Sequence, residues 1–154
     1  MDIIYASAIE HVLARGQLQD NLRTGQQILA VHGYSFSWNA KYHPVLHVRQ
    51  SFPKTAAAEL AWFLSGETST EWLSKHTKIW DEFKDESGEI PTAYGARWRH
   101  SFGVDQITNI IEKLKADPTS RQQILLSWDP RVDNVIPAKN IPCPFVYVFN
   151  ITFK

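Results

Sequence analysis

Cysteine is almost missing from this sequence. Its 154 residues include a single one, so no disulfide can form within the chain and a zinc site built from cysteines is excluded. Sixteen basic residues balance sixteen acidic ones without a polybasic run, so charge gives no affinity for a nucleic-acid backbone. No apolar stretch reaches the length of a membrane span, and the N-terminus has no signal-peptide pattern. We therefore expect a soluble cytoplasmic protein that binds neither nucleic acid nor membrane and holds no metal ion.

The composition that is present is that of a globular protein. Hydrophobic residues make up 44% of the sequence and aromatic residues 12%, more than a disordered chain carries. The length is typical of one domain, and neither internal repeats nor low-complexity linkers interrupt it. We therefore predict a single domain over residues 1–154.

Four segments have helical patterns: residues 2–15, 55–64 and 105–116, and a short helix that opens with a capping box at 68–71. The second is apolar on almost every side, which predicts a buried helix. The third has apolar side chains at helical spacing behind a cap at Asp105.

Four other segments are rich in β-branched and aromatic residues and predict strands: residues 27–38, 44–48, 122–128 and 145–153. The last is nearly continuous in apolar residues, which is typical of a strand covered on both faces. Helices and strands mix without strict alternation, so we expect an α+β domain.

Cys143 is the first candidate for chemistry. It lies between Pro142 and Pro144, directly before the last predicted strand. A lone cysteine is commonly a buried apolar residue, and that interpretation stays open here. The alternative is a nucleophile, which needs a cation to stabilise its thiolate. No histidine or lysine is placed nearby in the sequence, so a distant arginine would have to serve.

Glu59 is the second candidate, because it is a carboxylate within an otherwise apolar helix. It shares a helical face with Trp62 and Phe63. It either reaches the surface at the helix edge or lines a polar cavity, where a raised pKa would suit proton transfer.

The remaining candidates are two arginines and two aromatic residues. Arg23 lies in a Thr-Gly loop and Arg121 directly before a strand; each is either a phosphate ligand or half of a surface ion pair. Trp80 and Tyr94 lie in polar contexts, where an aromatic ring either stacks on a planar ligand or closes the edge of the core.

Taken together, six motifs resemble the thymidylate synthase family in order and spacing, over essentially the whole chain. They are RTG at 23–25, ELAWFLSG at 59–66, IWD at 79–81, YGARWR at 94–99, DPTSR at 117–121 and PC at 142–143. The pattern is similar to that of the related deoxypyrimidine hydroxymethylases as well.

The resemblance implies a mixed, twisted sheet with packed helices and a homodimer made sheet to sheet. It also implies transfer of a one-carbon unit from 5,10-methylenetetrahydrofolate to C5 of a deoxypyrimidine monophosphate. The product is dTMP from dUMP, or hydroxymethylated dUMP or dCMP. Cys143 would be the nucleophile that adds at C6. Arg121, supplied across the dimer interface, and Arg23 would bind the nucleotide phosphate.

The resemblance implies roles for the other three candidates too. Glu59 would organise water and proton transfer around the base and the folate. Tyr94 would belong to the network that helps to remove the C5 proton, and Trp80 would pack against the folate.

Three positions depart from the family pattern. Pro144 stands where a histidine usually follows the nucleophile, Gln122 stands where a second arginine is usual, and Phe83 replaces a tryptophan. These departures leave room for a hydroxymethylase, in which water rather than hydride completes the reaction.

Family enzymes also continue well past the nucleophile, so the resemblance covers a truncated version of the fold. We expect an enzyme that needs the missing C-terminal half, supplied in an intact parent or by a second polypeptide. The alternative is a non-catalytic module on the same scaffold that binds a nucleotide or has a regulatory or assembly role.

Overall fold

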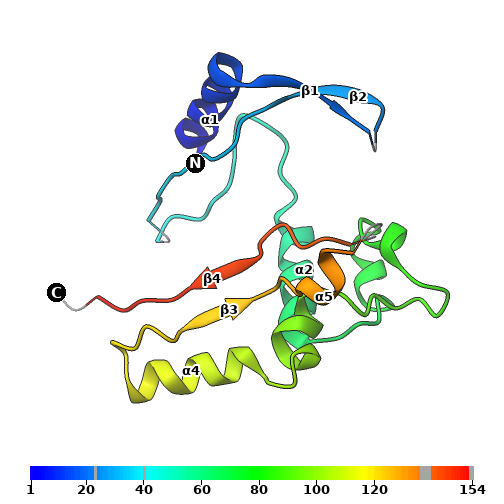
Figure 1. Cartoon of the computed structure of the whole chain (residues 1–154), viewed down its shortest axis with the longest axis vertical. Helices are drawn as coiled ribbons and strands as arrows, with labels where there is room; N and C mark the ends of the chain where they lie inside the picture. The colour runs from blue at the N-terminus through cyan, green and yellow to red at the C-terminus, as the bar shows by residue number, and fades with distance from the viewer. Residues whose placement is uncertain (23, 40, 136–139, 153–154) are drawn as a thin grey trace. The chain divides into compact units, whose positions relative to one another are not determined.

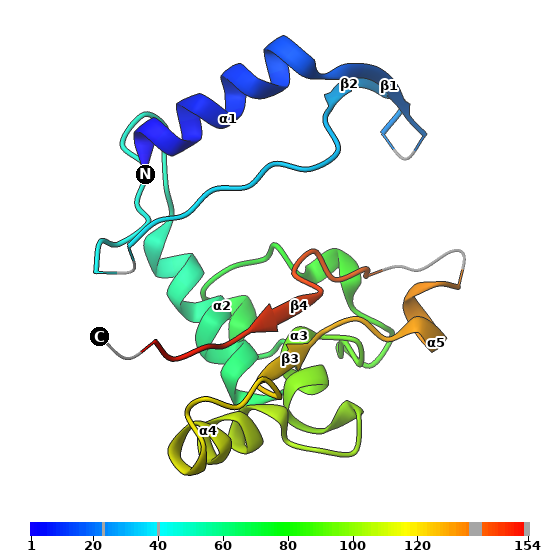
Figure 2. The same ribbon diagram turned by 60° about the vertical axis from the view of Figure 1, so that its left-hand side comes forward.

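The computed structural model describes residues 1–22, 24–39, 41–135 and 140–152. By their internal contacts they form two compact units, Met1–Pro53 and Lys54–Lys154 (Figure 1, Figure 2). None of the helices in the described part of the chain combines the length and apolar character that a membrane span requires.

The first unit contains a helix and a hairpin. Helix α1 (Asp2–Arg15) confirms the helix predicted there and ends at Gly16, whose amide donates to the Val12 carbonyl at 2.7 Å. The strands β1 (Gln17–Asn21) and β2 (Gln26–Ala30) follow and pair antiparallel.

The strand predicted over residues 27–38 is too long, and the one predicted over 44–48 is wrong. Strand β2 ends at Ala30, and no described residue from 31 to 52 belongs to a strand. The aromatic rings at positions 34, 36 and 38 do follow one another, with centroids 6.3 and 5.9 Å apart. The alternation of aromatic and other residues therefore places these three rings side by side. No neighbouring strand among the described residues supplies the hydrogen bonds that would make the segment part of a sheet.

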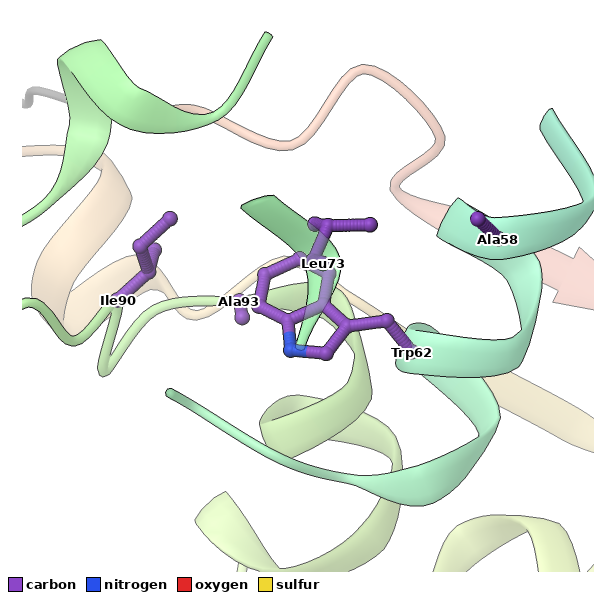
Figure 3. Packing of buried hydrophobic residues seen from close by; sticks show 5 residues of the cluster. All are labelled: Ala58, Trp62, Leu73, Ile90 and Ala93. Carbon is purple, nitrogen blue, oxygen red and sulfur yellow. The ribbon is translucent and has the colours of Figure 1, made fainter. Parts of the chain in front are cut away.

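Helix α2 (Pro53–Ser65) confirms the predicted helix, but only one of its faces is buried. Ala58 and Trp62 belong to a core cluster, in which the Trp62 indole extends from α2 between the other members (Figure 3). The cluster consists of Ala58, Trp62, Leu73, Ile90 and Ala93. Leu60 and Leu64 on other faces stay 52% and 42% exposed. The expectation of burial on almost every side is therefore wrong in this chain.

Residues 68–71 do not cap a helix, contrary to the prediction. The Thr68 hydroxyl donates to the Glu89 carboxylate, and the Thr68 carbonyl accepts from the Ile90 amide at 2.9 Å. These groups are engaged by a segment distant in the sequence. The 3₁₀ turn η1 (Leu73–Lys75) therefore begins without a side-chain cap.

Seven elements complete the second unit. They are η2 (Asp81–Phe83), α3 (Tyr94–Ala96), the π-helical turn η3 (Arg97–Ser101), α4 (Gln106–Ala116), β3 (Ile124–Leu126), α5 (Pro130–Asp133) and β4 (Val146–Val148). Helix α4 confirms the helix predicted there, and Asp105 caps it by accepting from the Thr108 amide at 3.0 Å. A second core cluster joins β3 to α3, η3 and α4. It is formed by Tyr94, Trp98, Ile110 and Leu125.

Strands β3 and β4 pair antiparallel, with Ile124 opposite Val148, and both are shorter than predicted. On one face Tyr147 packs edge-on against Trp98, with ring centroids 5.7 Å apart. Val146 and Val148 point away from that face and are exposed. The expected covering of this strand on both faces is therefore not present in the chain by itself.

The other edge of β3 is closed by a side chain. The Gln106 amide group accepts from the Leu126 N–H at 2.9 Å and donates to the Leu126 carbonyl at 3.0 Å. It also donates to the Arg97 carbonyl at 2.9 Å. Gln106 thereby joins the start of α4 both to β3 and to η3.

The fold is α+β in class, since helices accompany small antiparallel sheets. The described strands pair as β1 with β2 and β3 with β4, in two separate sheets. The larger mixed sheet that the family resemblance implies stays a prediction, as does the single domain.

Candidate active site

Cys143 lies on the segment that leads into β4, and the residue is exposed. Its backbone N–H donates to the Tyr94 hydroxyl oxygen at 3.0 Å, while the neighbouring Pro142 is buried. The interpretation of Cys143 as a buried apolar residue is therefore wrong. The structure holds the backbone at this cysteine and leaves the residue exposed, as a nucleophile requires.

Tyr94 opens α3 and is 8% exposed. Burial raises the pKa of the Tyr94 phenol, and this outweighs the opposing effect of the hydrogen bond from the Cys143 amide. The phenol is thus neutral near pH 7. Its oxygen accepts from the Cys143 backbone, and the hydroxyl also lies within hydrogen-bonding reach of the Cys143 side chain.

Glu59 and Trp80 form a second pair. Glu59 is half-buried on α2, and its Oε1 accepts from the Trp80 indole Nε1 at 2.7 Å. The carboxylate is therefore neither free at the helix edge nor enclosed. It is held in one orientation and keeps further acceptor sites for a second partner.

Aromatic rings connect these two pairs. The Trp80 ring meets the Tyr94 ring edge-on, with centroids 5.8 Å apart. Phe63 lies against both, with centroids 5.6 Å from Trp80 and 5.0 Å from Tyr94. The structure thus brings together four of the six predicted site residues, Glu59, Trp80, Tyr94 and Cys143, through edge-to-face packing.

A glycine makes this arrangement possible, because a Cβ atom at Gly95 would lie 2.4 Å from the Phe63 carbonyl oxygen. We expect Gly95→Ala to force α2 and α3 apart and to lower the free energy of unfolding by about 3 kcal/mol, the upper end of overpacking costs. Urea denaturation measures this. Gly103→Ala is the matched control: its φ is +75° but its surroundings are open, so it costs about 1 kcal/mol. Equal effects of the two changes would contradict the close approach.

The two predicted phosphate ligands are not part of this group. Arg121 is exposed, and no described residue forms a hydrogen bond or an ion pair with it, Cys143 included. Arg23 lies outside the described residues. The described residues contain no group of three or more histidines, cysteines or carboxylates able to hold a metal ion.

Sequence reasoning missed a buried ion pair beside the site. Arg97 and Asp133 are 2% and 5% exposed, and two hydrogen bonds of 2.5 and 2.8 Å join them. Burial by itself would raise the pKa of the Asp133 carboxyl, but hydrogen bonds from Arg97 and the Asp129 amide lower it overall. A signal was available for Arg97, which stands between apolar residues in the YGARWR motif. None pointed to Asp133, 36 positions away.

An exposed cysteine, a buried neutral phenol and an oriented carboxylate are groups that covalent nucleophilic catalysis can use. The sequence matches the family model described as thymidylate synthase over residues 3–154. The chain belongs to the thymidylate synthase family. Membership indicates a transferase and supports, for the family as a whole, folate-dependent one-carbon transfer to C5 of a dUMP-type nucleotide. Methylenetetrahydrofolate is the family's typical co-substrate, and its members are usually dimers.

Proposed function

We propose that this chain transfers a one-carbon unit from 5,10-methylenetetrahydrofolate to C5 of a deoxypyrimidine monophosphate. The reaction is dUMP to dTMP, or hydroxymethylation of dUMP or dCMP. The observation that carries the proposal is the exposed Cys143, whose backbone N–H donates to the Tyr94 hydroxyl. The Tyr94 ring packs against Trp80, whose indole holds the Glu59 carboxylate.

Cys143 would supply the nucleophile. Its thiolate sulfur forms a bond to C6 of the base, the C5–C6 double bond breaks, and the electron pair makes C5 able to attack an electrophilic carbon. After C5 has bonded to the one-carbon unit, the C5 proton would leave and the bond from that unit to the folate nitrogen would break. The unit would then take a hydride from the tetrahydrofolate, which becomes dihydrofolate, to give a methyl group, or a hydroxide from water to give a hydroxymethyl group. The sulfur–C6 bond would break to regenerate the thiolate. The Tyr94 hydroxyl, which contacts Cys143, would serve the water network that takes up the C5 proton.

Glu59 and Trp80 would face the base and the folate. Trp80 is half-buried, which leaves part of its ring for a planar ligand, and the adjacent Ile79 is 60% exposed and apolar. These two residues fit a pterin ring, and the remaining acceptor sites of Glu59 fit its N–H groups. The folate supplies the one-carbon unit; the protein supplies alignment and proton transfer.

Arg121 and Arg23 would bind the nucleotide phosphate in a homodimer. Support comes from Arg121, which is exposed and has no partner among the described residues, so its guanidinium is available to a phosphate of the second protomer's site. The thiol has to stay reduced to act, which favours a cytoplasmic location.

The test is covalent trapping. The purified chain is mixed with 5-fluoro-dUMP and methylenetetrahydrofolate, and its intact mass is recorded under denaturing conditions. Fluorine cannot leave from C5 as a proton does, so a working site keeps the nucleotide and the folate on Cys143. We expect the adduct in the native chain and not in Cys143→Ala, and none when the folate is omitted. No adduct with either the uracil or the cytosine fluoronucleotide would overturn the proposal for this chain by itself, and would leave either an enzyme that needs its missing C-terminal half or a non-catalytic module.

A further inference from the structure

Hydrogen bonds join the segment that carries Cys143, residues 140–145, to the rest of its unit at three of its described residues. The Asn140 side-chain amide lies 3.5 Å from the Thr92 carbonyl oxygen, at the long end of hydrogen bonding. The Cys143 amide donates to Tyr94 at 3.0 Å. The Phe145 carbonyl accepts from the Ser127 amide at 2.9 Å. The hydrogen bonds at the two ends of the segment are thus made with Thr92 and Ser127.

One guanidinium group, that of Arg97, donates hydrogen bonds to both Thr92 and Ser127. Arg97 Nε donates to the Thr92 carbonyl at 2.9 Å, and its Nη1 donates to the Ser127 carbonyl at 2.5 Å. The remaining N–H groups face Asp133, which also accepts from the Asp129 amide at 2.7 Å. Asp133 therefore both neutralises the guanidinium and fixes its plane.

Stability by itself does not explain why an ion pair, and not two apolar residues, is buried here. Its side chains are 3% and 0% exposed, and apolar residues of similar volume commonly serve as well in such places. What an apolar pair cannot do is to hold two carbonyl oxygens in fixed directions, which the rigid fork of an arginine does.

We propose that Arg97, oriented by Asp133, is a positioning residue for Cys143. It fixes Thr92 and Ser127, and through them both ends of the segment on which the thiol is carried. The proposal rests on the nucleophilic role proposed for Cys143, but it is testable on the geometry alone.

The experiment compares hydrogen exchange at two amides by NMR of the full chain. The Cys143 amide reports on the segment, and the Ile110 amide in α4 reports on global stability. In the paired replacement Arg97→Met with Asp133→Leu, we expect Cys143 to exchange about tenfold faster, the effect of losing one hydrogen bond's net contribution. Ile110 should stay within about twofold of the native rate. Arg97→Lys should behave like the paired replacement, because it keeps the charge but lacks the planar fork.

Arg131→Met is the matched control, since Arg131 is an exposed arginine paired with Asp129 on the same short helix; it should leave both amides unchanged. Equal acceleration at Cys143 and Ile110 would mean that the pair only stabilises the fold, and no acceleration at Cys143 would mean that it positions nothing. Either result overturns the proposal.

The trapping reaction separates this inference from the proposed function. If the native chain forms the fluoronucleotide adduct, the paired replacement should slow its formation about tenfold, in proportion to the faster opening of the segment. If the native chain forms no adduct but Cys143 exchange responds as expected, the proposed reaction fails and the positioning of the segment stands.

Discussion

Replacing Cys143 by serine is expected to lower the rate of C5 substitution by a factor on the order of 10⁴ or more, as loss of a nucleophile does in other covalent enzymes. Serine has nearly the same shape, but its hydroxyl is far less acidic than a thiol and forms almost no anion at neutral pH. Product formation is measured by mass spectrometry of the nucleotide. No second thiol exists in the chain to replace the first one.

The fold should tolerate this change, because serine keeps the backbone N–H that donates to Tyr94 at 3.0 Å. The midpoint of urea denaturation is therefore expected to stay at the native value, which separates loss of chemistry from loss of structure. Activity within tenfold of the native rate would show that the thiol is not the nucleophile.

Removal of Asp133 should have the largest effect on stability. Asp133→Ala leaves the Arg97 guanidinium 2% exposed without its counter-charge. Breaking a buried pair in this way costs about 3–5 kcal/mol of unfolding free energy. The paired replacement Arg97→Met with Asp133→Leu should cost much less, since no charge is left behind. Urea denaturation at pH 7 compares the three chains, and equal losses for the single and the paired change would contradict the account.

The effect of Asp133 also depends on pH in a defined direction. The pKa of this carboxyl is lower in the folded chain than its ordinary value of 3.8, which the unfolded chain keeps. The charged form is therefore favoured by folding. Its contribution is complete above about pH 5 and is lost as the pH falls through the folded-state pKa. The difference in stability between the native chain and Asp133→Ala should narrow below pH 4.

The fold was predictable where a segment's own pattern decides its structure. The side chains of α4 repeat at helical spacing behind Asp105, and the helix forms as predicted. Prediction failed where a distant segment decides. Thr68 binds the Glu89 carboxylate instead of capping a helix. The alternating aromatic residues of 34–38 have no described strand to pair with.

The same distinction applies to the site. Glu59, Trp80, Tyr94 and Cys143 could be named from motifs, and the structure places them in one connected group; their roles stay predictions. No motif could reveal that the Arg97 guanidinium binds Asp133, because the pair is made by tertiary packing. Arg121 could be predicted from its motif, but it has no hydrogen-bond or ion-pair partner in the described part of the chain, so its role stays a prediction.

The Gln106 side chain has a consequence for how the β3–β4 sheet could grow. A strand that approached the outer edge of β3 would need the N–H and the carbonyl of Leu126, and the Gln106 amide already occupies both. Helix α4, which begins with Gln106, lies beside β3 (Figure 1). By occupying these backbone groups, the Gln106 side chain opposes the addition of another strand at this position of β3. We therefore expect a further strand to join this sheet at β4, the strand that follows Cys143.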